Sequence, residues 1–153
     1  MIRRRRNRLG NDRGSELIEL AIVLPILLLI CAAIMDFGFL FQRYEVVTNA
    51  AREGARLASL ADTYSDTDIQ NRVNDYLTSS GLTAAPTAPV IVRSAMNVGG
   101  VGPVVDIVSV TVFYPSQFTF IGSLAGLVGG TGWTSITLRA TSVMRTESSA
   151  SGS

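Results

Sequence analysis

The sequence contains no histidine and no lysine, and it has one cysteine, Cys31. Histidine is the most frequent general base and metal ligand in proteins, so its absence argues against catalysis and against most metal sites. A lone cysteine allows no intrachain disulfide and no cysteine metal cluster, and Cys31 reads most simply as a small buried hydrophobe. We therefore expect no enzyme activity, no catalytic residues, no cofactor and no metal.

Positive charge is scarce outside the beginning of the chain. The chain has 13 basic residues and 12 acidic ones, and six of the arginines precede Gly14: Arg3, Arg4, Arg5, Arg6, Arg8 and Arg13. From Ser15 onward, seven arginines face eleven acids, a net charge of −4. An arginine cluster alone is typical of a nucleic-acid patch. Here an apolar run follows directly, and basic residues beside a first membrane helix stay on the cytoplasmic side.

The longest apolar run extends from Leu20 to Phe41, with Asp36 as its single charge. A bilayer core requires about 20 mostly apolar residues in a helix, since only a helix satisfies its own backbone in lipid. Pro25 lies inside this run, where it removes one hydrogen bond and permits a kink that membrane helices tolerate. We predict a basic leader over residues 1–14 and a transmembrane helix over residues 15–41.

Basic residues followed by an apolar run are also typical of a cleavable signal peptide. The run is longer than the usual 7–15 residues, and Asp36, Phe37 and Phe39 follow it in place of a clean small-residue site. Ala32 and Ala33 leave a weak cleavage site. A lipoprotein site at Cys31 fits less well, because Ile30 stands where a small residue is expected.

Glu16 and Glu19 stand just before the apolar run. An acid at the end of a membrane helix is unfavourable unless it has a partner, although both also suit the positive end of a helix dipole. The segment Arg13–Leu20 resembles a type IV prepilin processing site. That resemblance implies cleavage between Gly14 and Ser15 and pairing of Glu19, for assembly, with the terminal amine of a neighbouring subunit. For Glu16 we favour the helix dipole.

A more specific resemblance covers roughly residues 13–61. The residues that carry it are Glu19-Leu20-Ala21, Leu24-Pro25, Asp36-Phe37-Gly38 and Asn49-Ala50-Ala51-Arg52-Glu53-Gly54-Ala55-Arg56. In these motifs and their order the chain is similar to the TadE-like family, minor pseudopilins of the Tad (tight adherence, Flp-type) pilus system. The family often has Glu where Asp36 stands. The segment 138–147, LRATSVMRTE, is also similar to that family's C-terminal end. Assembly contacts are thus expected at Glu19, Pro25 and Asp36, although Asp36 could equally lie in the interfacial layer without a partner.

Residues 42–61 continue the helical pattern without a proline, so anchor and stem are expected to form one helix. Small residues recur along one side, including Ala50, Gly54 and Ala58. Such a stripe permits close approach of another backbone. We favour packing within the subunit over a dedicated subunit interface.

A second, short helix follows a break at residues 62–65. Thr67 and Gln70 have the spacing of a capping box, and Gly81 is a good C-terminal stop. Asp62, Asp66 and Asp68 lack the alternating ligands and central glycine of an EF-hand loop, so we prefer helix initiation to calcium binding.

After a turn-rich linker the hydrophobic period changes to two. We predict strands at residues 90–95, 104–114 and 134–144, the first two joined by a hairpin-like loop at 97–103. Val108, Val110 and Val112 share an inward face in the second strand, and Ile136, Leu138 and Ala140 do so in the third. Residues 118–133 read as an apolar loop or short helix that covers one edge of the core or docks on a partner subunit or the outer leaflet. Its glycines lack the lysine of a nucleotide-binding loop.

These patterns predict an α+β fold of type IV pilin form, with a long N-terminal transmembrane and stem helix, a short second helix and a small antiparallel sheet. Residues 42–147 form the extracytoplasmic domain, and 148–153 a disordered tail. The expected function is that of a minor pseudopilin in the bacterial inner membrane, N-terminus cytoplasmic and C-terminal domain periplasmic or extracellular. The resemblance implies, as partners, a prepilin peptidase, other pilins or pseudopilins and the Tad assembly platform. We expect no nucleic acid and no small-molecule substrate. The alternative is a single-pass anchored binding module outside any pilus, and an anchored enzyme is a distant third.

Overall fold

A computed structural model of the chain describes residues 12–60, 63–97, 104–127 and 135–146. Three helices and three strands occur in these ranges, in the order α1 (Asp12–Ser59), α2 (Asp66–Ser79), β1 (Val90–Asn97), β2 (Val104–Gln117), α3 (Phe120–Leu127) and β3 (Ser135–Arg145). The predicted α+β class is therefore confirmed. Arg3 to Arg8 of the basic leader, most of the 97–103 loop and the 148–153 tail lie outside the described ranges.

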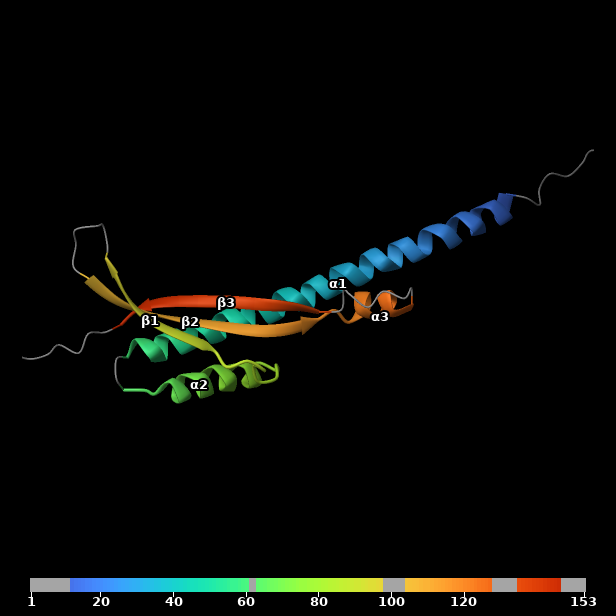
Figure 1. Ribbon diagram of the computed structural model, residues 1–153. Helices are drawn as coiled ribbons and strands as arrows, with labels where there is room; N and C mark the ends of the chain where they lie inside the picture. Colours follow the sequence, from blue (N-terminus) through green and yellow to red (C-terminus); the bar gives the residue numbers. More distant parts are fainter. Residues whose placement is uncertain (1–11, 61–62, 98–103, 128–134, 147–153) are drawn as a thin grey trace, which may run out of the picture.

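Helix α1 is one continuous element of 48 residues, about 72 Å long at 1.5 Å per residue. It runs through Pro25 and through the predicted boundary between residues 41 and 42. Figure 1 shows its N-terminal part projecting away from the rest of the molecule, while its C-terminal part lies along the sheet and α2. The predicted union of anchor and stem into one helix is confirmed.

The sheet is antiparallel, with strand order β1-β2-β3. In the central strand, alternate residues face α1, and Val108, Val110 and Val112 are completely buried. Leu138 and Ala140 of β3 are buried on the same face, as predicted. The prediction for Ile136 was wrong in part: it alternates with those two, yet it is 44 % exposed, because it is the second residue of an edge strand.

Helix α2 closes the core with Ile69, Val73 and Leu77, all completely buried. Its C-terminus has the predicted glycine stop: Gly81 has a φ of +83°, and the Leu82 N–H donates to the Leu77 carbonyl at 3.0 Å. A left-handed glycine with this bond is the usual way in which a helix satisfies its last carbonyls.

The predicted capping box of α2 was wrong by two residues. Ser65, not Thr67, is the N-cap, and its partner is Asp68, not Gln70. The Asp68 carboxylate accepts the Ser65 N–H at 3.0 Å and the Ser65 hydroxyl at 2.6 Å. These bonds from Ser65 lower the pKa of Asp68. A carboxylate is favoured over a neutral amide here because it faces the positive end of the helix dipole.

Candidate functional site

The N-terminal part of α1 is an exposed apolar cylinder. Its most apolar 18-residue window has a mean hydropathy of 2.9, and none of that window is buried. Large apolar side chains point outward all round it; Ile22, Leu28 and Ile34, for example, are 64 %, 60 % and 67 % exposed. In the described ranges this is the one helix long and apolar enough to cross a membrane. It fits a single-pass membrane anchor.

The residues of the predicted processing and assembly sites lie at the beginning of this cylinder. Gly14, Ser15 and Glu19 are all exposed, and no atom comes within 4 Å of where a Cβ of Gly14 would stand. Within the part of the chain that the structure describes, Glu19 has neither a hydrogen-bond partner nor an ion-pair partner. Pro25 and Cys31 are also exposed, so the expectation that Cys31 is buried was wrong for the single chain.

Asp36 differs sharply from its neighbours on the apolar run, because it is only 3 % exposed. Its carboxylate accepts backbone N–H groups from Thr119 at 2.9 Å, Phe120 at 3.0 Å and Ile121 at 2.6 Å. These are the first donors of α3, which have no partner within their own helix. Asp36 is therefore an N-terminal cap for α3, supplied from α1 more than 80 residues away in sequence.

Arg43, two turns further along α1 than Asp36, binds the end of β2, just before α3. Its Nη1 donates to the Ser116 hydroxyl at 2.9 Å and to the Gln117 carbonyl at 3.0 Å. Residues seven apart lie on one face of a helix, so Asp36 and Arg43 together fix the end of β2 and the beginning of α3 to α1. We call these two residues and their partners the polar latch. The sequence identified Asp36 as unusual but carried no signal for its partner.

The small-residue stripe of α1 is buried against the rest of the domain. Ala50 and Ala58 are 0 % and 5 % exposed, and Gly54 is buried where α1, α2 and β2 meet. A Cβ on Gly54 would stand 2.6 Å from Cγ2 of Val73 and 3.2 Å from Cγ1 of Val110. Glycine is thus required for the helices to approach this closely.

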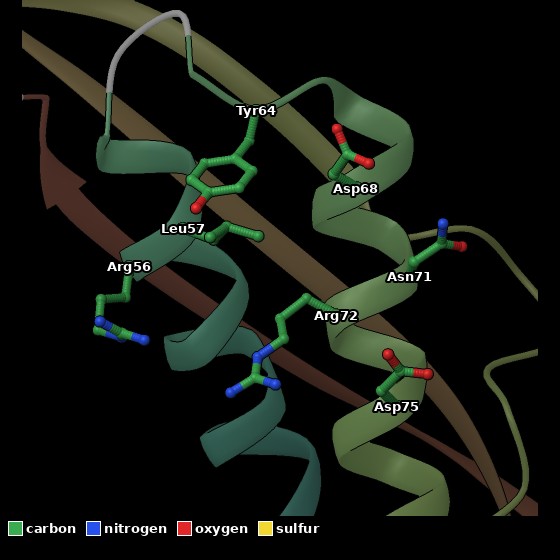
Figure 2. Close-up of a pocket in the computed structure, with 7 residues that line it drawn as sticks. All are labelled: Arg56, Leu57, Tyr64, Asp68, Asn71, Arg72 and Asp75. Atoms are coloured by element: carbon green, nitrogen blue, oxygen red, sulfur yellow. The ribbon is translucent and has the colours of Figure 1, made fainter.

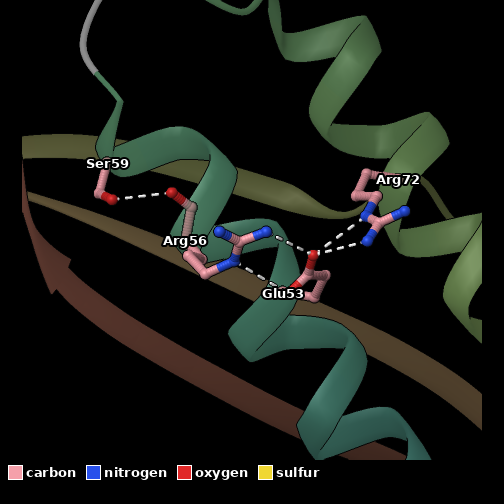
Figure 3. A network of polar contacts seen from close by, with 4 residues as sticks. All are labelled: Glu53, Arg56, Ser59 and Arg72. Carbon is pink, nitrogen blue, oxygen red and sulfur yellow. Dashed lines mark hydrogen bonds and ion pairs between the residues drawn. The ribbon is translucent and has the colours of Figure 1, made fainter.

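Glu53 is the centre of a charged network on the outer side of α1 (Figure 3). It accepts from Arg56 Nη2 at 3.0 Å and from Arg72 Nη2, on α2, at 2.8 Å. Hydrogen bonds from Arg56 and then Arg72 lower the pKa of Glu53 from 4.5 to about 2. The Glu53–Arg72 pair joins α1 to α2.

A shallow hollow of about 350 Å³ lies between α1 and α2 beside this network (Figure 2). It is lined by Arg56, Leu57, Tyr64, Asp68, Asn71, Arg72 and Asp75. Charges of both signs line it, and three of them already have partners: Asp68 caps α2, and Arg56 and Arg72 both pair with Glu53. No group of three or more His, Cys, Asp or Glu side chains that could hold a metal occurs in the described ranges. The distinctive chemistry of the molecule lies instead along α1.

Comparison with known proteins finds a similarity that lies within α1. No curated protein and no solved structure matches the chain. The family model described as TadE-like protein matches residues 14–56, which include the exposed Gly14, the two α1 residues of the polar latch, and Ala50 and Gly54 of the buried stripe. The resemblance predicted from the sequence is confirmed over that segment: residues 14–56 are similar to the TadE-like family.

Proposed function

We propose that this chain is a minor pseudopilin of the Tad system, a structural subunit that is cleaved by a prepilin peptidase and assembled by packing of its membrane helix. One observation carries the proposal. A single 48-residue helix presents a bare apolar half of membrane length and uses its other half as the core of a small α+β domain. A subunit of this shape can leave a membrane and join a fibre without refolding.

The mechanism proposed for assembly starts at the exposed N-terminal end of α1. Cleavage after Gly14 would place a new amine at Ser15, four residues before Glu19. Glu19 is exposed among apolar side chains, with Ile18 at 65 % and Leu20 at 56 % exposure on either side. In lipid, a carboxylate and an ammonium from two subunits relieve each other's desolvation, which would align neighbouring helices. Pro25 and the surrounding apolar surface would form the rest of that helix contact.

The proposed location is the bacterial inner membrane, crossed once. The arginines before Gly14 favour a cytoplasmic N-terminus, and the α+β domain then lies on the outer side. The proposed partners are the prepilin peptidase, other pilins or pseudopilins and the Tad assembly platform. No enzymatic activity, nucleic acid or small-molecule substrate is part of the proposal.

The experiment is the intact mass and N-terminal sequence of the protein from native membranes, for wild type and for Gly14→Leu. We expect the wild type to begin at Ser15 with α1 retained. Gly14→Leu should stay uncleaved and absent from sheared pili, because the bulky side chain precedes the scissile bond. Gly10→Leu, a glycine in the same basic segment, is the matched control and should be processed normally.

Two other results would overturn the proposal. A wild-type chain that begins at Met1 and reaches the membrane whether or not Gly14 is replaced would be an anchored binding module. A chain that begins beyond Ala33 would be a secreted protein without the anchor.

A further inference from the structure

The position of α3 relative to the apolar run has a consequence for the membrane. Asp36 lies about 24 Å along the helix axis from Leu20, where the apolar run begins, and a bilayer core is about 30 Å thick. The next charged residue of α1 after Asp36 is Arg43. If α1 crosses a bilayer along this run, the Asp36 carboxylate is at or just below the outer edge of the hydrocarbon.

An isolated carboxylate at that depth is strongly unfavourable. The structure supplies its partners from the beginning of α3: the backbone N–H groups of Thr119, just before the helix, and of Phe120 and Ile121, at 2.6–3.0 Å, and the positive end of the helix dipole. Because Asp36 is held by the first residues of α3, the beginning of that helix must lie at the same depth. Figure 1 shows α3 at the end of the domain from which the N-terminal part of α1 projects.

The composition of α3 suits such a place. Its eight residues, FIGSLAGL, carry no charge. The hydroxyl of Ser123, its only polar side chain, donates to the Thr119 carbonyl at 2.7 Å, so this donor is satisfied without water. Phe120 is 37 % exposed, and α1 presents Phe37, Phe39 and Phe41 at the same level, with exposures of 60 %, 45 % and 68 %.

We propose that α3 is a second membrane contact: an interfacial helix that enters the outer leaflet beside α1, with its N-terminus capped by Asp36. The exposed apolar surface of α1 extends to the beginning of α3, which contacts α1 and where Phe120 is partly exposed, and this continuity selects lipid as the occupant. The polar latch then fixes how deep and at what tilt the domain sits on the membrane. The inference requires that α1 cross a bilayer, and it does not depend on cleavage at Gly14 or on assembly.

Fluorescence quenching in lipid vesicles tests it on the full chain. In a Trp133→Phe background, single tryptophans are introduced by Phe120→Trp in α3, Phe37→Trp in α1 as the bilayer reference, and Tyr64→Trp beside α2 as the aqueous reference. We expect residue 120 to resemble residue 37, with blue-shifted emission, strong quenching by acyl-brominated phosphatidylcholine and little quenching by aqueous acrylamide. Residue 64 should show the reverse.

Two outcomes would overturn the proposal. Acrylamide quenching at residue 120 as strong as at residue 64 would place α3 in water. Protection from both quenchers, reversed by diluting the protein in lipid, would mean that a second copy of the chain covers α3.

A second reporter at another α3 position checks that the tryptophan at residue 120 does not itself change the position of α3. A nitroxide on Ser123→Cys, with Cys31→Ala, should collide more with oxygen than with a water-soluble nickel chelate. The opposite ratio would count against lipid contact. A wild-type start at Met1 would refute the pseudopilin proposal and leave this result unaffected.

Discussion

The two halves of α1 reverse the usual relation between side-chain size and burial. In the N-terminal half, Leu27 and Leu28 are 53 % and 60 % exposed, whereas in the C-terminal half Ala50 and Ala55 are completely buried. A water-facing helix would bury its leucines and expose its alanines. The difference indicates two solvents: lipid accepts the large apolar side chains, and close packing against α2 and the sheet requires the small ones.

The polar latch lies where these two environments meet, and removing it should have the largest effect. Asp36→Asn keeps the shape of the side chain but leaves one acceptor oxygen for three N–H donors. Losing the charged acceptor and leaving a buried N–H donor without an acceptor should destabilise the attachment of α3 by about 2–3 kcal/mol. We expect amide hydrogen exchange at Thr119, Phe120 and Ile121 to accelerate by about 30- to 150-fold in detergent micelles.

The control for this variant is Glu45→Gln, an exposed acid on the same helix. It should leave exchange in α3 unchanged. Equal rates in the two variants would mean that Asp36 does not hold α3.

A methyl group on the buried stripe should have the next largest effect. Gly54→Ala gains about 1 kcal/mol of helix propensity, but its Cβ would stand 2.6 Å from Val73, and overpacking costs about 1–3 kcal/mol. We expect a net loss of up to about 2 kcal/mol in the free energy of unfolding of the domain, measured by circular dichroism in micelles.

Gly38→Ala makes the same chemical change in the exposed half. No atom lies within 4 Å of its Cβ position, so it should not destabilise the protein. A destabilisation of equal size at both glycines would contradict the assignment of two environments.

The Glu53 network should give the smallest effect and a pH dependence. Because the pKa of Glu53 falls to about 2 in the folded state, its contribution is complete above pH 4.5 and is lost as the pH falls toward 2. Arg56 and Arg72 are more than half exposed, so the contribution is about 1 kcal/mol or less. Unfolding titrations of Glu53→Gln between pH 7 and pH 2 should show this acid-dependent part missing.

Asp75→Asn, an exposed acid beside the same hollow, should keep the acid dependence of the wild type. If both variants follow the wild type throughout, Glu53 contributes nothing to the acid response.

Local pattern predicted most of the fold. The alternation of Val108, Val110 and Val112 identified β2 and its buried face, and Gly81 identified the end of α2. The wrong predictions concern positions where the local sequence allows several arrangements of similar energy. Thr67 and Gln70 have the preferred capping spacing, but Ser65 with Asp68 gives a stronger acceptor two residues earlier. Ile136 has the right period, yet its exposure depends on how far the edge strand is covered.

Length, hydropathy and backbone satisfaction are properties of consecutive residues, so the sequence was sufficient to show that α1 is long enough and apolar enough to cross a membrane. It also identified Asp36 as the single charge of the apolar run, and left open whether that charge has a partner. That Asp36 has partners, and which residues they are, depends on the three-dimensional fold, since Thr119, Phe120 and Ile121 lie 83–85 residues away in sequence. The same holds for Arg43 with Ser116, 73 residues apart. The segment around a polar group predicts whether that group will lose contact with water. Which donor or acceptor then replaces the water depends on the topology of the whole chain.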